Sequence, residues 1–435
     1  MSKGRILHEE RSAAAPDRLL HRLSSLLARL PRDRDRSETE LYHRASIGLR
    51  VLRRAGSTSP ASHRGHDEGL AVRTRSGGER RLSFAACSGS SEASLRWILD
   101  RAGQCGPAGG AESDSWSRGA KAVRVDRDEQ SELPSQEELA EWLDRAWSGL
   151  RDPESPAAHR LEPIEAWVEV ASTIESWAGD GGLKASRVRR RAWALVRLRR
   201  TDGCGSTPRP LQIAARRWPE LSDRGWRDLL EDQWFPAEHG ARATRRRGPV
   251  LFNPACSSRL ILALVTALHR HDHEEEVPVG PAWKLVDDPG EPTALYGGSF
   301  DDAGFPSRRK RLADGERTIG ILRGRGHYRR PSYRDRPAPL PSHLHLTAKR
   351  GDPPPRGILV SGLTLHPLAP NRWALEIEGA ELEGGRPGRG IRGAVIHVAP
   401  EELVRRCVTA VGPPRDSYRG VRTPGLVFDG LEVGG

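Results

Sequence analysis

The chain is predicted to be a mixed α/β (α+β) protein with an N-terminal domain of mixed sheet and helices and a C-terminal domain dominated by β-strands. Its 435 residues exceed what one ordinary hydrophobic core organises. Helical and strand periodicities alternate through the first half, whereas the second half has many short apolar runs bounded by glycine and proline. The change follows the arginine run at 245–247, so the expected domains are residues 1–245 and 246–435.

The first half shows the spacing of amphipathic helices and alternating strands. Leucines at helical spacing predict a helix over 19–30, and serine caps predict further helices beginning near Ser91 and Ser135. The strands are expected at 46–53, 69–74, 81–86, 164–174 and 188–198, with a turn at 179–182. Polar composition predicts loops at 57–68 and 103–134, and a helical region is expected over 223–245.

The second half contains two predicted helices among short strands. An apolar helix is expected over 256–268, and a late helix over 400–411 begins with Pro-Glu-Glu, which suits the helix dipole. The expected strands are 249–252, 283–286, 357–360, 373–377, 393–398 and 426–433. Strands therefore dominate the expected C-terminal domain.

Composition argues against membrane and secreted classes. No stretch approaches the roughly 18 apolar residues that cross a bilayer, and the charged N-terminal segment lacks the apolar region of a signal peptide. The five cysteines form no Cys-x-x-Cys pair, which argues against a disulfide framework and a thiolate zinc site. We therefore expect a cytoplasmic protein with free thiols and no membrane partner.

The net charge of +12 has two possible sources. All but six of the 70 basic residues are arginine, which is typical of a GC-rich coding bias. A surface for nucleic acid or an acidic partner is the alternative. The charge is concentrated between Phe305 and Arg336, a segment with eleven basic and three acidic residues.

A histidine cluster is the sharpest chemical feature of the sequence. On a continued helix, His269 and His273 lie at i and i+4, a spacing that can hold zinc, with Glu274 available as a base. The His-Glu-x-x-His pattern of metalloproteases is absent, however, because no second histidine follows Glu274 at the required position. A solvated helix end is the alternative interpretation.

Two further patterns allow more than one interpretation. The acidic pairs Asp287–Asp288 and Asp301–Asp302 could bind a cation, but aspartates beside glycine or proline more often cap turns. An arginine-rich segment also carries aromatic residues, and its candidate binding residues are Arg323, Arg325, Arg329, Arg330 and Tyr333. That mixture suits single-stranded nucleic acid, an extended peptide with a carboxylate end, or a solvated loop.

Several segments occur in an order that is typical of one family. They are GPVLFNPACSSRLILALVTAL (248–268), WKLVDDPGEP (283–292), GGSFDDAGFPSRRKRLADGERTIGILRGRG (297–326), HLHLTAKRG (343–351), ILVSGLTL (358–365) and TPGLVFDGLEVGG (423–435). In the first half, a Gly-x-Ala-Val-Arg strand at Gly69–Arg73 and a Phe-Ala strand end at Phe84–Ala85 precede a serine-capped helix. Together these segments resemble the TldD/PmbA family, the so-called modulators of DNA gyrase, over most of the chain.

The resemblance implies a two-branch family. The TldD branch holds a metal on a helix through His-Glu-x-x-x-His, with help from a later cysteine. The PmbA branch, also called TldE, lacks these ligands and pairs with TldD in a peptidase that acts on peptides or unfolded polypeptides. Here the corresponding helix reads LILALVTALHR (260–270), with leucine, valine, threonine and alanine at the ligand positions, and Cys407 lies earlier, on an expected helix. The chain therefore resembles the metal-free branch.

These implications predict a non-catalytic subunit of a TldD/PmbA-type metallopeptidase complex. The chain is expected to bind no cofactor, while zinc or a similar divalent metal resides in a TldD-type paralogue that forms a heterodimer with it; a homodimer is the other possibility. The arginine-rich segment would contact the peptide substrate. Two alternatives remain: a stand-alone metallopeptidase using His269, His273 and Glu274, and a basic nucleic-acid-binding protein.

Overall fold

A computed structural model shows two sheets, one in each half of the chain. It describes residues 21, 23–25, 27–28, 36–76, 82–104, 123–127, 133–150, 161–180, 182, 184–200, 209–222, 241–242, 245–270, 278–318, 328–330, 332, 334, 338–369, 371–417 and 420–434. The expected mixed α/β fold is confirmed. Among the described residues, no helix combines the length and apolar character needed to cross a bilayer.

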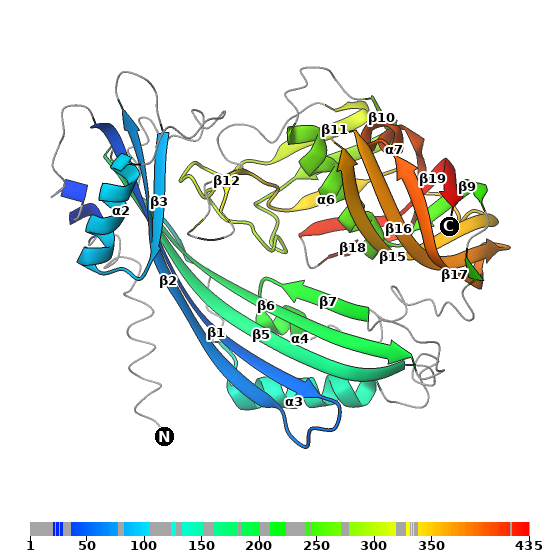
Figure 1. The fold of residues 1–435 in the computed structure, drawn as a ribbon, viewed down its shortest axis with the longest axis horizontal. Coiled ribbons are helices and arrows are strands. Elements are labelled where there is room, and N and C mark those ends of the chain that lie inside the picture. Colours follow the sequence, from blue (N-terminus) through cyan, green and yellow to red (C-terminus); the bar gives the residue numbers. More distant parts are fainter. Residues whose placement is uncertain are drawn as a thin grey trace.

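The N-terminal sheet has seven strands in the order β3-β2-β1-β5-β6-β4, with β7 also pairing with β6. Its strands are β1 (Arg36–Arg54), β2 (Ala61–Ser76), β3 (Leu82–Ser88), β4 (Val123–Arg127), β5 (Leu161–Gly179), β6 (Lys184–Arg200) and β7 (Arg209–Ala215). Helices α2 (Glu92–Gln104), α3 (Gln136–Gly149) and α4 (Trp218–Ser222) belong to the same half. The long strands curve beneath the C-terminal half, and α3 lies on their opposite side (Figure 1).

Each larger helix of this half covers part of the sheet with an apolar face. Leu139 and Leu143 of α3 are fully buried in a cluster with Val168 of β5 and Ala194 of β6. A second cluster joins α2 to β2 and β3. Ser135 caps α3 in a complete capping box, as its sequence predicts.

The second sheet contains most of the C-terminal half. Its path is β11-β10-β14-β19-β9-β15-β16-β17-β8, β18 pairs with β19, and β17 pairs back with β19 so that five strands close into a ring. Its strands are β8 (Ala241–Arg242), β9 (Arg246–Phe252), β10 (Pro278–Asp287), β11 (Lys310–Thr318), β14 (Leu344–Thr347), β15 (Arg356–Ala369), β16 (Arg372–Glu383), β17 (Arg386–Val398), β18 (Cys407–Asp416) and β19 (Val421–Gly434). A separate short pair consists of β12 (Tyr328–Arg329) and β13 (Ala338–Pro339). The remaining helices are α6 (Pro254–Arg270) and α7 (Pro400–Arg406).

Several element predictions were wrong in extent. The expected loop at 57–68 contains the first part of β2, because β1 supplies a hydrogen-bonding partner along its length. The expected loop at 103–134 contains β4, which pairs in parallel with β6. The late helix ends at Arg406 rather than 411, because Cys407 begins a strand that pairs with β19. Most of the expected helical region at 223–245 lies outside the described residues.

Candidate functional site

A row of charged side chains crosses the face of the N-terminal sheet that meets the C-terminal half. The strand register places Glu175 of β5 opposite Arg44 of β1 on one side and opposite Arg187 of β6 on the other. Residues directly opposite each other on neighbouring strands project from the same face of a sheet. The register alone therefore gathers these three charged groups on one face.

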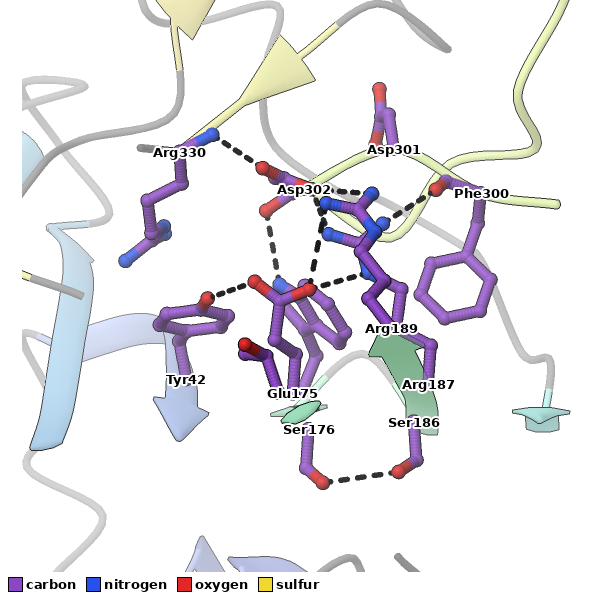
Figure 2. A network of polar contacts seen from close by, with 12 residues as sticks. Tyr42, Glu175, Ser176, Ser186, Arg187, Arg189, Phe300, Asp301, Asp302 and Arg330 are labelled. Carbon is purple, nitrogen blue, oxygen red and sulfur yellow. Dashed lines mark hydrogen bonds and ion pairs between the residues drawn. The ribbon is translucent and has the colours of Figure 1, made fainter. Parts of the chain in front are cut away.

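The C-terminal half contributes a carboxylate to this row through the loop that follows β10. Asp301 Oδ1 accepts hydrogen bonds from the backbone N–H groups of Ala303 and Phe305, each at 2.9 Å, and so caps the turn. The neighbouring Asp302 is 1% exposed and forms a buried ion pair with Arg187 (Figure 2). The turn thus places the carboxylate of Asp302, from the C-terminal half, against Arg187 of the N-terminal sheet.

Arg187 is the centre of this network, which we call the interface network. Its Nε donates to Glu175 Oε2 at 2.6 Å, and its Nη1 donates to the carbonyl oxygen of Phe300 at 2.9 Å. On the other side of Glu175, the Tyr42 hydroxyl donates to Oε1 at 2.7 Å. The guanidinium of Arg187 is completely buried, so these partners replace water in stabilising its positive charge.

Aromatic packing surrounds the network. Trp177 Nε1 donates to the backbone oxygen of Asp302 at 3.0 Å, and its ring meets Phe300 edge to face with centroids 5.4 Å apart. Tyr42 packs against the same tryptophan at 5.1 Å. These contacts pack one side of the ion pairs and tie the two halves together.

Opposite charges set the protonation states of the network. Burial alone would raise the pKa of Glu175, but the guanidinium of Arg187, followed by those of Arg189 and Arg44, holds this pKa well below its usual range. Burial likewise opposes ionisation of Asp302, and Arg187 with Arg189 lowers its pKa. Both carboxylates are therefore ionised at neutral pH.

The pKa of Tyr42 is shifted in the opposite direction, upward. Burial raises its pKa well above the ordinary value, and the negative charge of Glu175 and then Asp302 raises the pKa further. The phenol therefore keeps its proton and acts as a hydrogen-bond donor to Glu175.

A polar cavity of about 280 Å³, which we call the interface cavity, lies beside the interface network. Both halves of the chain line it, with Arg44, Thr173, Glu175, Arg189 and Arg191 from the N-terminal sheet and Tyr296, Asp302, Arg329 and Arg330 from the C-terminal half. Arg187, Arg189 and Arg191 share one face of β6 because side chains alternate along a strand. The cavity is thus a cationic space between the two halves.

Aromatic rings hold three of its arginines in place. The guanidinium carbons of Arg191 and Arg329 lie 4.5 and 3.6 Å from the ring centroid of Tyr296. The guanidinium of Arg330 lies 4.2 Å from the ring centroid of Tyr42. Such stacking orients a guanidinium without neutralising it.

Burial and the crowding of like charges lower the pKa values of these arginines. Burial, followed by repulsion from Arg187, lowers the pKa of Arg189, and burial with repulsion from Arg189 lowers that of Arg191. Burial also lowers the pKa of Arg329 and Arg330. An arginine remains protonated at neutral pH despite such shifts, so the lining stays positively charged.

Of the predicted substrate-binding residues, Arg329 and Arg330 line the cavity. Arg323, Arg325 and Tyr333 lie outside the described residues. Sequence reasoning missed Arg189 and Arg191, although two arginines spaced two residues apart in the predicted strand 188–198 were a usable signal. It also missed the pairing of Asp302 with Arg187, which are 115 residues apart.

The acidic pairs divide between turn capping and long-range contacts. Asp288 Oδ1 accepts the backbone N–H of Gly290 at 3.1 Å, so it and Asp301 cap turns as expected. Asp287, by contrast, accepts the backbone N–H groups of Ser342 and His343 at 2.9 and 2.7 Å. One aspartate of each pair therefore joins distant segments, and turn chemistry explains only the other.

The described side chains of α6 over residues 260–267 do not fit a zinc ion. Leu260, Ile261 and Leu264 are buried in the C-terminal core, and the hydroxyl of Thr266 donates to the carbonyl oxygen of Leu262 at 2.8 Å. Zinc requires imidazole, thiolate or carboxylate ligands. Across the part of the chain that the structure describes, no three His, Cys, Asp or Glu side chains are grouped to hold a metal.

The alternative metal ligands are only partly placed. The backbone of His269 belongs to the last turn of α6. His273 and Glu274 lie outside the described residues, so their spacing to His269 stays a sequence prediction.

Cys407 is buried at the start of β18, and the prediction that it lies on a helix was wrong. Burial raises the pKa of its thiol to about 12. Because the thiolate is the form that binds metals and attacks substrates, this cysteine is inert at neutral pH.

No family model matches the chain, and no curated protein matches it by sequence. Solved structures match its fold closely. TldE from Thermococcus kodakarensis superposes with a TM-score of 0.70 at 15% identity, covering 92% of this chain and 97% of the other. A protein from Bacteroides thetaiotaomicron, described as a candidate modulator of DNA gyrase, gives a TM-score of 0.70 at 14% identity, covering 96% and 98%.

A protein from Thermotoga maritima with the same description gives a TM-score of 0.68 at 14% identity, covering 91% of this chain and 96% of the other. The chain therefore has the fold of TldE and of these gyrase-modulator proteins over nearly its whole length. The resemblance to the TldD/PmbA family that the sequence indicated is confirmed at the level of the fold.

Proposed function

We propose that this chain is a non-catalytic TldD/PmbA-family subunit of the metal-free branch. It pairs in the cytoplasm with a metal-bearing TldD-type chain, and the complex cleaves peptides or unfolded polypeptides. The fold shared with TldE supports the family assignment. A homodimer is the alternative assembly.

The chemistry of α6 carries the non-catalytic part of this proposal. A metal-dependent peptidase must polarise a water molecule, which requires a cation held by protein ligands. From Leu260 to Val265 the buried positions of this helix are aliphatic, and the Ser257 hydroxyl donates to the carbonyl oxygen of Phe252 at 3.1 Å. The metal and its bound water would therefore come from the partner chain.

The arginine-rich segment supports a role in holding substrate. Arg329 and Arg330 line the interface cavity, where a guanidinium can bind a peptide carboxylate through two parallel hydrogen bonds. Arg323, Arg325 and Tyr333 belong to the same stretch of sequence and are proposed to extend this contact.

Co-expression with a metal-bearing TldD-type chain tests the subunit role. We expect a stable complex that hydrolyses peptides, little hydrolysis by either chain alone, and metal only in the partner. Failure to form a complex, or equal hydrolysis by the partner without this chain, would contradict the proposal.

A double variant separates the stand-alone metallopeptidase from the subunit. His269→Ala/His273→Ala should leave the complex fully active if the metal belongs to the partner. Stoichiometric zinc on the isolated chain that is lost in this variant would establish the alternative. Strong salt-dependent binding of single-stranded nucleic acid would instead favour the third hypothesis.

A further inference from the structure

The interface cavity carries more positive charge than its own carboxylates can balance. Among the described residues, five arginines and two carboxylates line it, which gives a formal excess of three positive charges in a space of about 280 Å³. The fully buried Arg187, directly behind the lining, adds a further positive charge. Protein interiors ordinarily pair such charges, because an unpaired buried charge is costly.

The two carboxylates are already engaged by Arg187. Glu175 accepts Nε of that side chain at 2.6 Å, and Asp302 forms its ion pair with the same guanidinium. Arg189 reaches the two carboxylates only at 3.6 and 3.4 Å. The nearest anions are therefore shared, and they contact Arg187 most closely.

Three of the other lining arginines have no carboxylate of their own among the described residues. Within the described residues, Arg191, Arg329 and Arg330 form no ion pair within 4.0 Å. Arg329 Nη1 donates to the backbone oxygen of Pro341, and the guanidinium of Arg191 stacks on the ring of Tyr296. These are neutral contacts, which position the guanidinium groups and leave their charge uncompensated.

Unused donors line the same space. The Nε atoms of Arg189, Arg191 and Arg329 are buried and have no hydrogen-bond partner among the described protein atoms. Arg330, which is 5% exposed, has both Nε and Nη1 in this state. A buried donor without an acceptor costs about 1–3 kcal/mol, so this many of them at one cavity indicates a site built for acceptors.

We propose that this cavity binds a small oxyanion with two or more negative charges, carrying carboxylate or phosphate groups. A guanidinium fork matches the geometry of both groups, and the excess of positive charge along the described lining favours an anion with more than one negative charge. The volume is near the lower end of ordinary ligand pockets, which favours a compact anion. The lowered pKa values of Arg189 and Arg191 agree with this, since an anion would relieve their mutual repulsion.

The ligand would also act as a tie between the two halves. Arg189 and Arg191 belong to the N-terminal sheet, whereas Arg329 and Arg330 come from β12 and the residue after it. An anion bound between them adds attraction across the interface, so it stabilises the folded chain. This inference does not depend on the subunit role, and it concerns the isolated chain.

Calorimetric titration of the full chain with pyrophosphate and with citrate tests the proposal and separates the two chemical classes. We expect one anion per chain, an affinity that falls as salt concentration rises, and a higher thermal unfolding midpoint in the presence of the anion. Tighter binding of pyrophosphate assigns the site to phosphates, and tighter binding of citrate assigns it to carboxylates.

Two variants and a matched control locate the site. Arg191→Gln and Arg329→Gln each remove one lining charge and should weaken binding about tenfold or more. Arg389→Gln removes the same charge from an exposed position on β17 and should leave the affinity within about twofold. Arg191→Lys keeps the charge but loses the fork, so it should bind with intermediate affinity.

The outcomes are separable from those of the peptidase experiment. Absence of binding to both anions, with no change in the thermal midpoint of the wild-type chain, overturns the proposal. Equal affinity in the Arg191→Gln, Arg329→Gln and Arg389→Gln variants also overturns it, because the anion would then bind elsewhere. Anion binding without any complex formation would leave the cavity assignment standing and remove only the subunit role.

Discussion

Strands β5 and β6 present one face to helix α3 and the other to the C-terminal half, and the two faces differ in chemistry. Beneath α3, Val168 and Ala194 pack in an apolar cluster with Leu143. Toward the C-terminal half, Glu175 and Arg187 meet a carboxylate from a distant loop. Because side chains alternate along a strand, neighbouring residues of β5 or β6 point into these two different environments.

The difference shows what each face contributes to stability. The apolar face is stabilised by burial, which is non-directional and tolerates changes that preserve volume. The charged face requires specific partners, because removing one partner of a buried ion pair lowers the stability of the fold by about 3–5 kcal/mol. The first face therefore stabilises the N-terminal sheet and its helix, and the second determines how the C-terminal half is joined to that sheet.

The largest effect is expected from removing the central arginine of the interface network. Arg187→Met leaves Glu175 and Asp302 buried without their main counter-ion, at a cost of about 3–5 kcal/mol in the free energy of unfolding. Urea denaturation measures this loss. Arg199→Met on the same strand is the control, because its ion pair with Glu162 is exposed and should contribute about 0–1 kcal/mol. Equal losses in the two variants would contradict the central role of Arg187.

A comparable substitution on the apolar face should lower the free energy of unfolding through lost burial and cavity formation, without any change in charge. Leu143→Ala deletes a fully buried side chain beneath the sheet and should cost about 2–5 kcal/mol. Leu133→Ala is the matched substitution at an exposed leucine and should stay within about 0.5 kcal/mol. Anion binding at the cavity should be unchanged in a folded Leu143→Ala chain, whereas weakened binding would show that the two faces are coupled.

A smaller effect is expected from acid. The pKa of Glu175 is lower in the folded chain than its ordinary value of 4.5, so its contribution to stability is complete above about pH 4.5 and decreases as pH falls further. Asp302 acts in the same direction below its ordinary value of 3.8. The difference in urea midpoint between the wild-type chain and Glu175→Gln should therefore narrow below about pH 4.5. A difference that stays constant would show that Glu175 does not stabilise the chain through its charge.

The smallest effect concerns the start of α3. Ser135→Ala removes the side-chain acceptor of the Glu138 N–H, which lies 3.1 Å away, and should cost about 1 kcal/mol. Ser148→Ala changes an exposed serine within the same helix and provides the control. Thermal unfolding of both variants measures the difference, and equal midpoints would show that the capping box does not contribute.

Local patterns in the sequence were sufficient for much of the fold. The spacing of Leu139 and Leu143 and the cap at Ser135 predicted α3, and the apolar run after Cys256 predicted α6. These signals are local because a helix satisfies its backbone within its own segment and needs only one apolar face. Strand extents were less well predicted, as for β2, because a neighbouring strand decides where the backbone finds partners.

The candidate site depended on contacts that no local pattern contains. The sequence by itself determined that Arg329 and Arg330 are cationic, that odd-numbered arginines share a face of β6, and that residues 260–268 of α6 include no metal-ligating side chain. Only the tertiary structure placed Asp302 against Arg187, 115 residues away, and enclosed the lining arginines between the two halves. The physical reason is that periodicity specifies the face of an element, whereas the pairing of buried charges is specified by which elements meet.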